Sequence, residues 1–137
     1  MFVLDASVAA SWCFPDETAS LASSVLERMI HEGAVVPALF WFEVRNVLLT
    51  GERRQRLTEA QTAQFLSYLD ALGIEIDRGP NSVVVCALAR TYQLSVYDAA
   101  YLELAQRKGI PMASLDRALC SAARKAGVPL LGESDPG

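Results

Sequence analysis

Short apolar runs that alternate with longer segments of helical periodicity are the feature that most limits the fold of this 137-residue chain. Runs of this length suit buried strands, and the intervening segments repeat apolar residues at the spacing of amphipathic helices. Strands joined through helices pair in parallel, and helices then cover both faces of the sheet. We therefore predict an α/β fold with a parallel sheet. The predicted strands span residues 2–4, 34–36, 74–76, 111–114 and 128–131.

Turn and capping residues mark the ends of the predicted helices. Thr58 and Gln61 form a capping-box pattern, and Asn81 and Ser95 are of the type that caps a helix N-terminus. Pro37 suits the first turn of the helix that follows the second strand. The predicted helices run from about residue 5 to 14, 16 to 32, 38 to 49, 58 to 72, 81 to 92, 95 to 108 and 116 to 125.

Length and composition indicate one globular domain. The chain is 52% hydrophobic and 20% charged, a balance typical of a folded core and not of a disordered segment. We predict a single domain over residues 1–131 and a frayed tail at 132–137. No apolar run approaches the roughly 20 residues of a membrane span, and the N-terminus lacks the pattern of a signal peptide. The three cysteines show no metal-ligand spacing, so we expect buried, reduced thiols in a cytoplasmic protein with no membrane contact.

Four acidic residues, Asp5, Glu43, Asp98 and Asp116, stand beside or within apolar segments. Two such charges about 4 Å apart interact by roughly 4 kcal/mol at an effective dielectric of about 20. A fold that gathers several carboxylates is best explained by a hard cation such as Mg2+ or Mn2+, which takes oxygen ligands. Asp5 and Asp116 each follow a predicted strand, and the carboxyl ends of parallel strands lie at one edge of the sheet, where ligands bind.

A simpler explanation exists for each of these acids. An aspartate is a common N-cap and is favoured in the first turn of a helix, and Ser95 with Asp98 also fits a capping box. Glu43 lies in mid-helix, where Leu39, Glu43, Asn46 and Thr50 form one stripe, and this stripe could simply be solvated.

Basic and aromatic clusters also leave alternatives open. The three arginines of the one basic cluster either form a solvated loop or contact phosphate groups, and the net charge of −4 argues against broad nonspecific binding of nucleic acid. The aromatic residues suit the core, a dimer face or an exposed patch for a partner. These residues are Arg53, Arg54 and Arg56 in the basic cluster, and Trp12, Phe40, Trp41 and Phe42 in the aromatic one.

Five segments, taken in order, have the pattern of a known family. They are VLDAS at 3–7, FPDE at 14–17, the segment 36–46 that ends in EVRN, LSVYDAAYLELA at 94–105, and ASLDRAL at 113–119 with Gly127 and Val128 beyond it. Through them the chain resembles the PIN-domain ribonucleases, and closely the VapC toxins of prokaryotic toxin–antitoxin pairs, over nearly its whole length. The resemblance implies a three-layer α/β/α fold with a five-stranded parallel sheet.

The resemblance also implies an acidic pocket. Asp5 and Asp98 match the main metal ligands of the family, and Glu43 and Asp116 match the acids that complete the site, directly or through water. Arg45 stands where a small residue is common, and it could pair with an acid or contact RNA. Ser7, Asn46 and Ser114 match polar neighbours that orient the carboxylates.

We therefore predict a Mg2+- or Mn2+-dependent endoribonuclease that acts as a toxin, in which a metal-activated water attacks the phosphodiester. The resemblance further implies a homodimer and a cognate antitoxin that lies across an apolar groove and obstructs the pocket. The alternative is a catalytically inert PIN-fold module that binds protein. A dehalogenase-like phosphatase is disfavoured because Ser7 stands where its second aspartate is needed. The residues predicted to contact RNA are Arg45, Arg53, Arg54 and Arg56.

Overall fold

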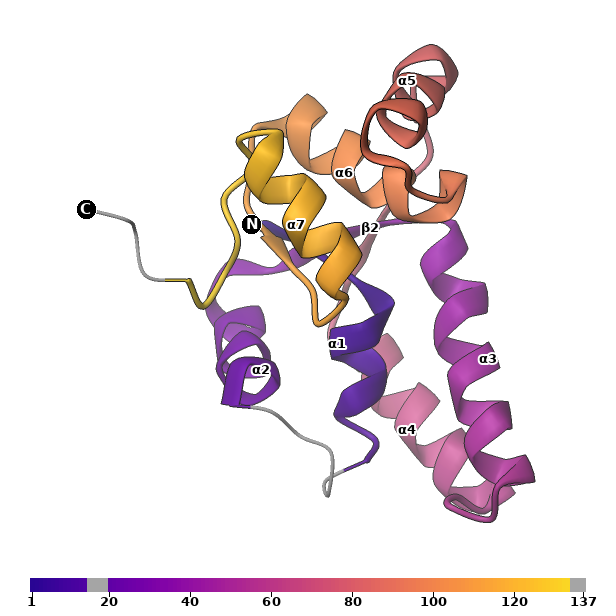
Figure 1. Cartoon of the computed structure of the whole chain (residues 1–137). Coiled ribbons are helices and arrows are strands. Elements are labelled where there is room, and N and C mark those ends of the chain that lie inside the picture. Colours follow the sequence, from indigo (N-terminus) through magenta and orange to yellow (C-terminus); the bar gives the residue numbers. More distant parts are fainter. Residues whose placement is uncertain (15–19, 134–137) are drawn as a thin grey trace.

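A parallel sheet of four strands in the order β3-β2-β1-β4 forms the centre of the fold (Figure 1). The structure, a computed structural model, describes residues 1–14 and 20–133. In this sheet Val3 lies opposite Val35 on one side of β1 and opposite Met112 on the other. The predicted α/β fold with a parallel sheet is confirmed. The strands are β1 (Phe2–Leu4), β2 (Ala34–Pro37), β3 (Glu75–Asp77) and β4 (Met112–Ala113).

The predicted fifth strand is wrong. Within the described residues, the segment 128–131 forms only an isolated parallel bridge between Leu130 and Met112. Pro129 lacks an N–H group and can only accept, from the Met112 N–H, so it interrupts a ladder that needs donors on both strands. The N–H of Val128 is also used elsewhere, because it donates to Ala123 O at the end of the preceding helix.

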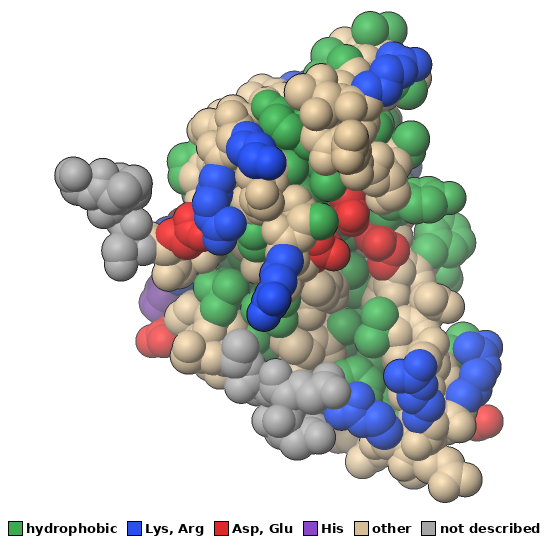
Figure 2. All heavy atoms as spheres, in the orientation of Figure 1, with side chains coloured by type: hydrophobic (Ala, Val, Ile, Leu, Met, Phe, Trp, Pro, Cys, Tyr) green, Lys and Arg blue, Asp and Glu red, His purple; other side chains and the backbone are tan. Residues whose placement is uncertain are grey.

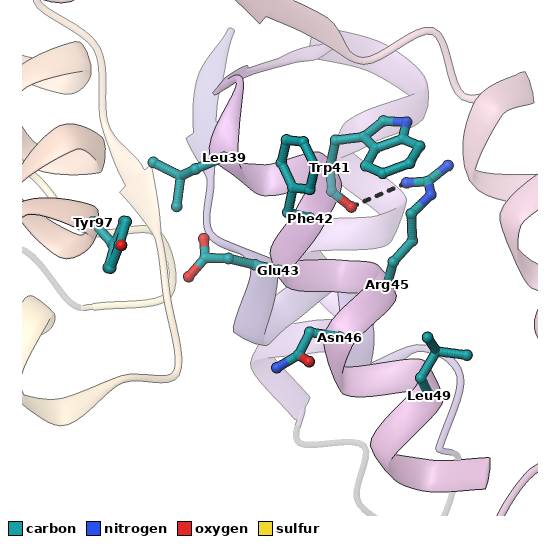
Figure 3. A pocket seen from close by; sticks show the side chains of 8 residues that line it. All are labelled: Leu39, Trp41, Phe42, Glu43, Arg45, Asn46, Leu49 and Tyr97. Carbon is teal, nitrogen blue, oxygen red and sulfur yellow. Dashed lines mark hydrogen bonds between the residues drawn. The ribbon is translucent and has the colours of Figure 1, made fainter.

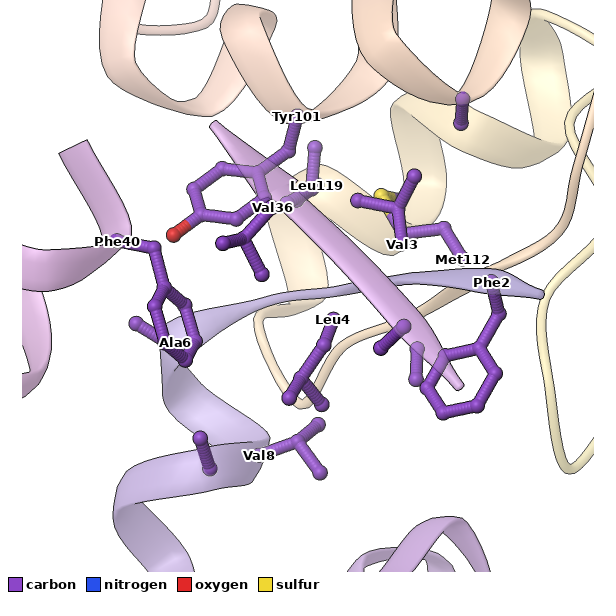
Figure 4. Close-up of a cluster of buried hydrophobic side chains, with 14 of the residues drawn as sticks. Phe2, Val3, Leu4, Ala6, Val8, Val36, Phe40, Tyr101, Met112 and Leu119 are labelled. Atoms are coloured by element: carbon purple, nitrogen blue, oxygen red, sulfur yellow. The ribbon is translucent and has the colours of Figure 1, made fainter. Parts of the chain in front are cut away.

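Helices cover both faces of the sheet, as expected for parallel strands. Figures 1 and 4 show α6 and α7 on one face and α1 on the other, and α6 contacts both β1 and β2. No helix among the described residues is long and apolar enough to cross a bilayer. The helices are α1 (Ala6–Ser11), α2 (Ser20–Glu32), α3 (Leu39–Arg53), α4 (Glu59–Ala71), α5 (Ser82–Tyr92), α6 (Val96–Lys108) and α7 (Arg117–Lys125).

Most helix boundaries follow from local signals. Thr58 and Gln61 form the predicted reciprocal capping box, and the side chains of Asn81 and Ser95 accept hydrogen bonds from N–H groups in the first turns of α5 and α6. Pro37 ends β2 and does not open α3, so its predicted place was wrong. The predicted start of the second helix at residue 16, and residues 134–137 of the predicted tail, lie outside the described residues.

Helix α3 continues past its predicted end at residue 49 to Arg53. Gly51 lies inside the helix, where the ring of Phe14 packs closely against it: a Cβ atom at this position would lie 2.9 Å from Phe14 Cζ. The glycine therefore permits a close approach between segments and does not stop the helix.

The core lies on both sides of β1. All three residues of this strand are fully buried, and Figure 4 shows Phe2 and Leu4 pointing to one face while Val3 points to the other. This burial explains why the strand is apolar at every position. Cys13, Cys86 and Cys120 are free thiols, but they are half-buried and not fully enclosed as predicted.

A buried ion-pair network joins α6 to the end of the edge strand β3. Glu103 is 2% exposed, and its Oε1 accepts hydrogen bonds from Arg107 Nε at 2.7 Å and from the Asn81 N–H at 3.3 Å. Arg107 Nη1 also donates to Asp77 Oδ1 at 3.1 Å. The arginine thus compensates a carboxylate that would otherwise be buried without a partner.

Candidate active site

Asp5 lies at the carboxyl end of β1, where its backbone N–H donates to Ala113 O at 3.0 Å and so joins the ends of β1 and β4. The side chain is nearly buried, with 6% of the residue exposed. Its Oδ2 atom accepts two short hydrogen bonds, from Ser7 Oγ at 2.7 Å and from Ser114 Oγ at 2.6 Å. Two hydroxyl groups from opposite ends of the chain therefore hold this carboxylate.

The direction of these two hydrogen bonds is determined by the backbone. Ser7 Oγ accepts from the Leu115 N–H, and Ser114 Oγ accepts from the Asp116 N–H, each at 3.0 Å. Because each hydroxyl has a single proton, it turns that proton towards Asp5. Ser7 and Ser114 thus have the surroundings expected of residues that orient a carboxylate.

Glu43 is held in place by Tyr101. The Tyr101 hydroxyl donates to Glu43 Oε1 at 2.7 Å and so joins α6 to α3. Tyr101 is fully buried, and Figure 4 shows its hydroxyl at the outer end of the ring, towards the side of Phe40. Sequence reasoning missed this role. The available signal was a tyrosine in an apolar stretch of α6, because a buried tyrosine hydroxyl usually requires a partner.

The four predicted acids form one electrostatic cluster. Burial is the main cause that raises the pKa of Asp5, and the charge of Asp116 adds to it, whereas the serine hydrogen bonds oppose it. Burial likewise raises the pKa of Glu43, with further contributions from Asp5 and Asp98. The pKa of Asp98 is raised by burial, then by Asp116 and Asp5. In Figure 2 acidic side chains gather in a hollow near the centre of the view.

The capping explanation holds for one of these acids. Asp116 Oδ1 accepts from the Leu119 N–H at 2.9 Å, so this residue caps α7 and also contributes its charge to the cluster. Asp5 precedes α1 but makes no side-chain capping hydrogen bond. Asp98 lies in the first turn of α6, where its backbone N–H donates to Ser95 Oγ at 3.0 Å. Capping therefore does not account for the cluster as a whole.

The donor chemistry of the cluster fits a hard cation, although the side chains do not form a closed cage. Among the described residues no group of three His, Cys, Asp or Glu side chains is arranged to hold a metal ion. Mg2+ usually keeps several waters and is bound through one or two carboxylates, so a closed cage is not required. Burial, with the charges of neighbouring acids, raises the pKa of Asp5, Glu43 and Asp98 and so disfavours their ionised forms, and a bound cation would offset this effect.

An apolar cavity of about 610 Å³ adjoins the acidic cluster (Figure 3). We call it the α3 groove. Glu43 belongs to both, because it lines the groove and interacts with Asp5 and Asp98. Three residues of the predicted stripe, Leu39, Glu43 and Asn46, line the groove, whereas its fourth member, Thr50, lines a neighbouring cavity. The full lining is Leu39, Trp41, Phe42, Glu43, Arg45, Asn46, Leu49 and Tyr97.

Arg45 and Asn46, two polar residues of α3, have different surroundings from the four acids. Arg45 stacks on Trp41, with Cζ 3.6 Å from the ring centroid, and Nη1 donates to Trp41 O at 3.1 Å. Figure 3 shows it directed away from Glu43, and no ion pair joins it to the four acids in the part of the chain described. Asn46 lines the groove, and none of its described contacts is a hydrogen bond to a carboxylate.

The residues of the predicted basic cluster lie together on the surface, whereas those of the predicted aromatic cluster are divided between the core and the surface. Arg53, Arg54 and Arg56 are exposed around the end of α3, and Figure 2 shows a group of basic side chains apart from the acidic hollow. Arg54 and Arg56 line a cavity of about 170 Å³ together with Asn46, which also lines the α3 groove. Of the aromatic residues, Phe40 is in the core, Trp12 donates to Ala22 O at 2.8 Å, and Trp41 and Phe42 are exposed.

Fold and site together define the class of protein. A family model described as the PIN domain matches residues 2–125, and the chain belongs to this family. PIN domains are generally nucleases and typically use Mg2+ or Mn2+.

Solved structures show the same fold at low sequence identity. The crystal structure of PAE2754 from Pyrobaculum aerophilum is 20% identical, with a TM-score of 0.71 over 88% of this chain and 83% of that one. The crystal structure of FitAcB from Neisseria gonorrhoeae is 18% identical, with a TM-score of 0.66 over 95% and 96% of the two chains. Curated protein sequences provide no match to the chain.

Proposed function

We propose that this protein is a Mg2+- or Mn2+-dependent endoribonuclease. The observation that carries the proposal is the electrostatic cluster of Asp5, Glu43, Asp98 and Asp116 at the carboxyl edge of the sheet. Open α/β sheets bind ligands at this edge. Asp5 is buried and the other three acids are half-buried, and no ion pair joins any of them to a basic residue within residues 1–14 and 20–133. Such a cluster suits a cation, and a cation there suits the cleavage of a phosphodiester.

Each residue has a defined part in this proposal. Asp5 and Asp98 hold the cation, and Glu43 and Asp116 complete the site directly or through water. When bound, the cation neutralises phosphate charge and lowers the pKa of a bound water. Ser7 and Ser114 keep Asp5 in one orientation through the hydrogen bonds described above. Tyr101 does the same for Glu43.

Substitution of the two main ligands tests the proposal. We expect Asp5→Asn and Asp98→Asn each to reduce Mn2+-dependent cleavage of RNA at least about a hundredfold, within the range that metal-ion and electrostatic catalysis contributes. Glu27→Gln, an exposed acid on α2, is the matched control and should cleave normally. Circular dichroism checks that the variants fold. Full activity of either folded aspartate variant would refute the assignment.

Calorimetric titration with Mn2+ separates the nuclease from the inert PIN-fold module. The nuclease requires binding of Mn2+ that Asp98→Asn weakens. The inert module requires no binding at all, so a flat titration of the wild-type protein would favour that alternative.

We further propose that the protein is a toxin of the VapC type, active in the cytoplasm as a homodimer and inhibited by a cognate antitoxin. Support comes from the five sequence segments and from an exposed apolar groove beside the acids. Expression of the chain alone should arrest growth, and Asp98→Asn should relieve the arrest. Unchanged growth under strong expression would contradict the toxin role.

Contacts of Arg45, Arg53, Arg54 and Arg56 with RNA remain a proposal as well. The last three are exposed close to a cavity that shares Asn46 with the α3 groove. Each lost phosphate contact should lower the dependence of RNA affinity on salt concentration by about one unit of slope.

A further inference from the structure

Asp98 joins the acidic cluster from the first turn of α6, the helix that Ser95 caps. Ser95 Oγ accepts a hydrogen bond from the Asp98 N–H at 3.0 Å. Residues at this spacing can form a reciprocal capping box, in which the second side chain accepts from the backbone N–H of the first residue. Gln61 makes that return bond to the Thr58 N–H at 2.9 Å. In the part of the chain that the structure describes, Asp98 makes no such bond to the Ser95 N–H.

The Asp98 carboxylate takes part in the acidic cluster instead. Burial is the main cause that raises its pKa, and the charges of Asp116 and Asp5 add to it, so this carboxylate interacts with both neighbouring acids. An aspartate side chain is one methylene shorter than the glutamate or glutamine of a capping box, which accounts for the missing return bond. A half-buried carboxylate that repels its neighbours requires a donor to keep it in place.

Ser95 has the same hydrogen-bonding arrangement as the two serines that hold Asp5. Ser7 and Ser114 each accept from a backbone N–H and turn their single proton towards a carboxylate. Ser95 also accepts from a backbone N–H, that of Asp98, so its one proton is directed elsewhere. A hydrogen bond with the Ser95 side chain opposes the burial that raises the pKa of Asp98, which identifies the Asp98 carboxylate as the acceptor.

We infer that Ser95 is a positioning residue for Asp98, in addition to capping α6. Its hydroxyl is fixed by the Asp98 N–H and in turn orients the Asp98 carboxylate in the cluster. This inference rests on the proposed nuclease function and deepens it, because it gives the second main ligand the kind of support that the first receives from Ser7 and Ser114. A serine that only capped the helix would affect stability and leave metal binding unchanged.

Substitution of Ser95 by glycine separates the two roles. Glycine is nearly as good an N-cap as serine, but it has no hydroxyl group to orient Asp98. In calorimetric titration we expect Ser95→Gly to weaken Mn2+ affinity about three- to tenfold, while Tm falls by less than about 2 °C. The loss is smaller than the roughly 10- to 100-fold typical of orienting residues, because Ser95 is exposed and water can replace part of the interaction. Ser95→Thr keeps the hydroxyl and should bind Mn2+ as the wild type does.

Thr58→Ala is the matched control for loss of a cap. It removes a hydroxyl that accepts from the Gln61 N–H at 3.1 Å at the start of α4. Its Tm should fall by about 3–5 °C with Mn2+ affinity unchanged. Ser95→Ala removes both the cap and the orienting hydroxyl, so it should show the fall in Tm and the loss of affinity together.

The same titrations decide against the inference if Ser95→Gly binds Mn2+ as tightly as the wild type, or if Ser95→Thr loses as much affinity as Ser95→Gly. In either case the nuclease proposal stands when Asp98→Asn still weakens Mn2+ binding. A flat titration of the wild-type protein would instead overturn the nuclease proposal, and this inference with it.

Discussion

Replacement of Tyr101 by phenylalanine tests whether Glu43 must be held in place for the site to bind metal. The change removes the hydroxyl that donates to Glu43 Oε1 at 2.7 Å and leaves the fully buried ring in the core. Hydrogen bonds to charged groups contribute about 1.5–3 kcal/mol, but Glu43 is half-buried and water can replace part of the interaction. We expect a loss of about 1 kcal/mol in the free energy of unfolding, or roughly 3–5 °C in Tm for a chain of this length.

The effect on metal binding should be larger than the effect on stability. Loss of a residue that orients a ligand typically weakens metal affinity about 10- to 100-fold. The Tyr101 hydrogen bond also lowers the pKa of Glu43, so its removal raises that pKa further. Because a carboxylate must lose its proton to bind metal, the pH midpoint of Mn2+ binding should move upward.

Calorimetric titration with Mn2+ at several pH values measures both quantities. Tyr92→Phe, which removes a hydroxyl from α5 and leaves the cluster intact, is the control and should bind Mn2+ normally. Unchanged Mn2+ affinity and an unchanged pH midpoint in Tyr101→Phe would refute the reasoning, whatever the change in Tm.

Three further predictions concern stability. The pKa of Asp5 is raised in the folded state, so ionisation of Asp5 destabilises the wild-type protein as pH rises above about 4. The free energy of unfolding of Asp5→Asn, measured by urea denaturation in EDTA, should therefore increase relative to that of the wild type over this pH range. A difference between the two proteins that does not change with pH would contradict the reasoning. Mn2+ at a hundred times its Kd should stabilise the wild-type protein by about 2.7 kcal/mol, and EDTA should remove this gain. Arg107→Ala leaves the Glu103 carboxylate buried without its ion-pair partner and should cost about 3–5 kcal/mol in the free energy of unfolding. Arg28→Ala breaks an exposed pair and should cost much less, so equal losses would be inconsistent with the burial.

Local signals in the sequence were enough for most elements of the fold. Thr58, Asn81 and Ser95 cap helices where their residue types predicted, because capping depends on only a few neighbouring residues. The apolar run 2–4 became the central strand for a similarly simple reason, since it has no polar face to expose to water. The apolar surroundings of Asp5, Glu43, Asp98 and Asp116 singled these acids out, and the resemblance to a family then implied their roles.

Local signals failed where a distant segment decided the outcome. Gly51 was expected to break the helix, but it lies within α3 at a point where the ring of the distant Phe14 leaves no room for a side chain. Phe40 and Phe42 have the same side chain and lie two residues apart, yet one is buried and the other is exposed, because α3 turns only one side to the core.

The sequence alone therefore determined the order and type of most elements, and it singled out four acids that the fold gathers in one electrostatic cluster. Only the tertiary structure decided which groups orient those acids: Ser114 reaches Asp5 across 109 positions, and Tyr101 reaches Glu43 across 58. Helix caps and strand patterns arise from neighbours along the chain, whereas these contacts exist only once the sheet and the helices have packed in one particular order.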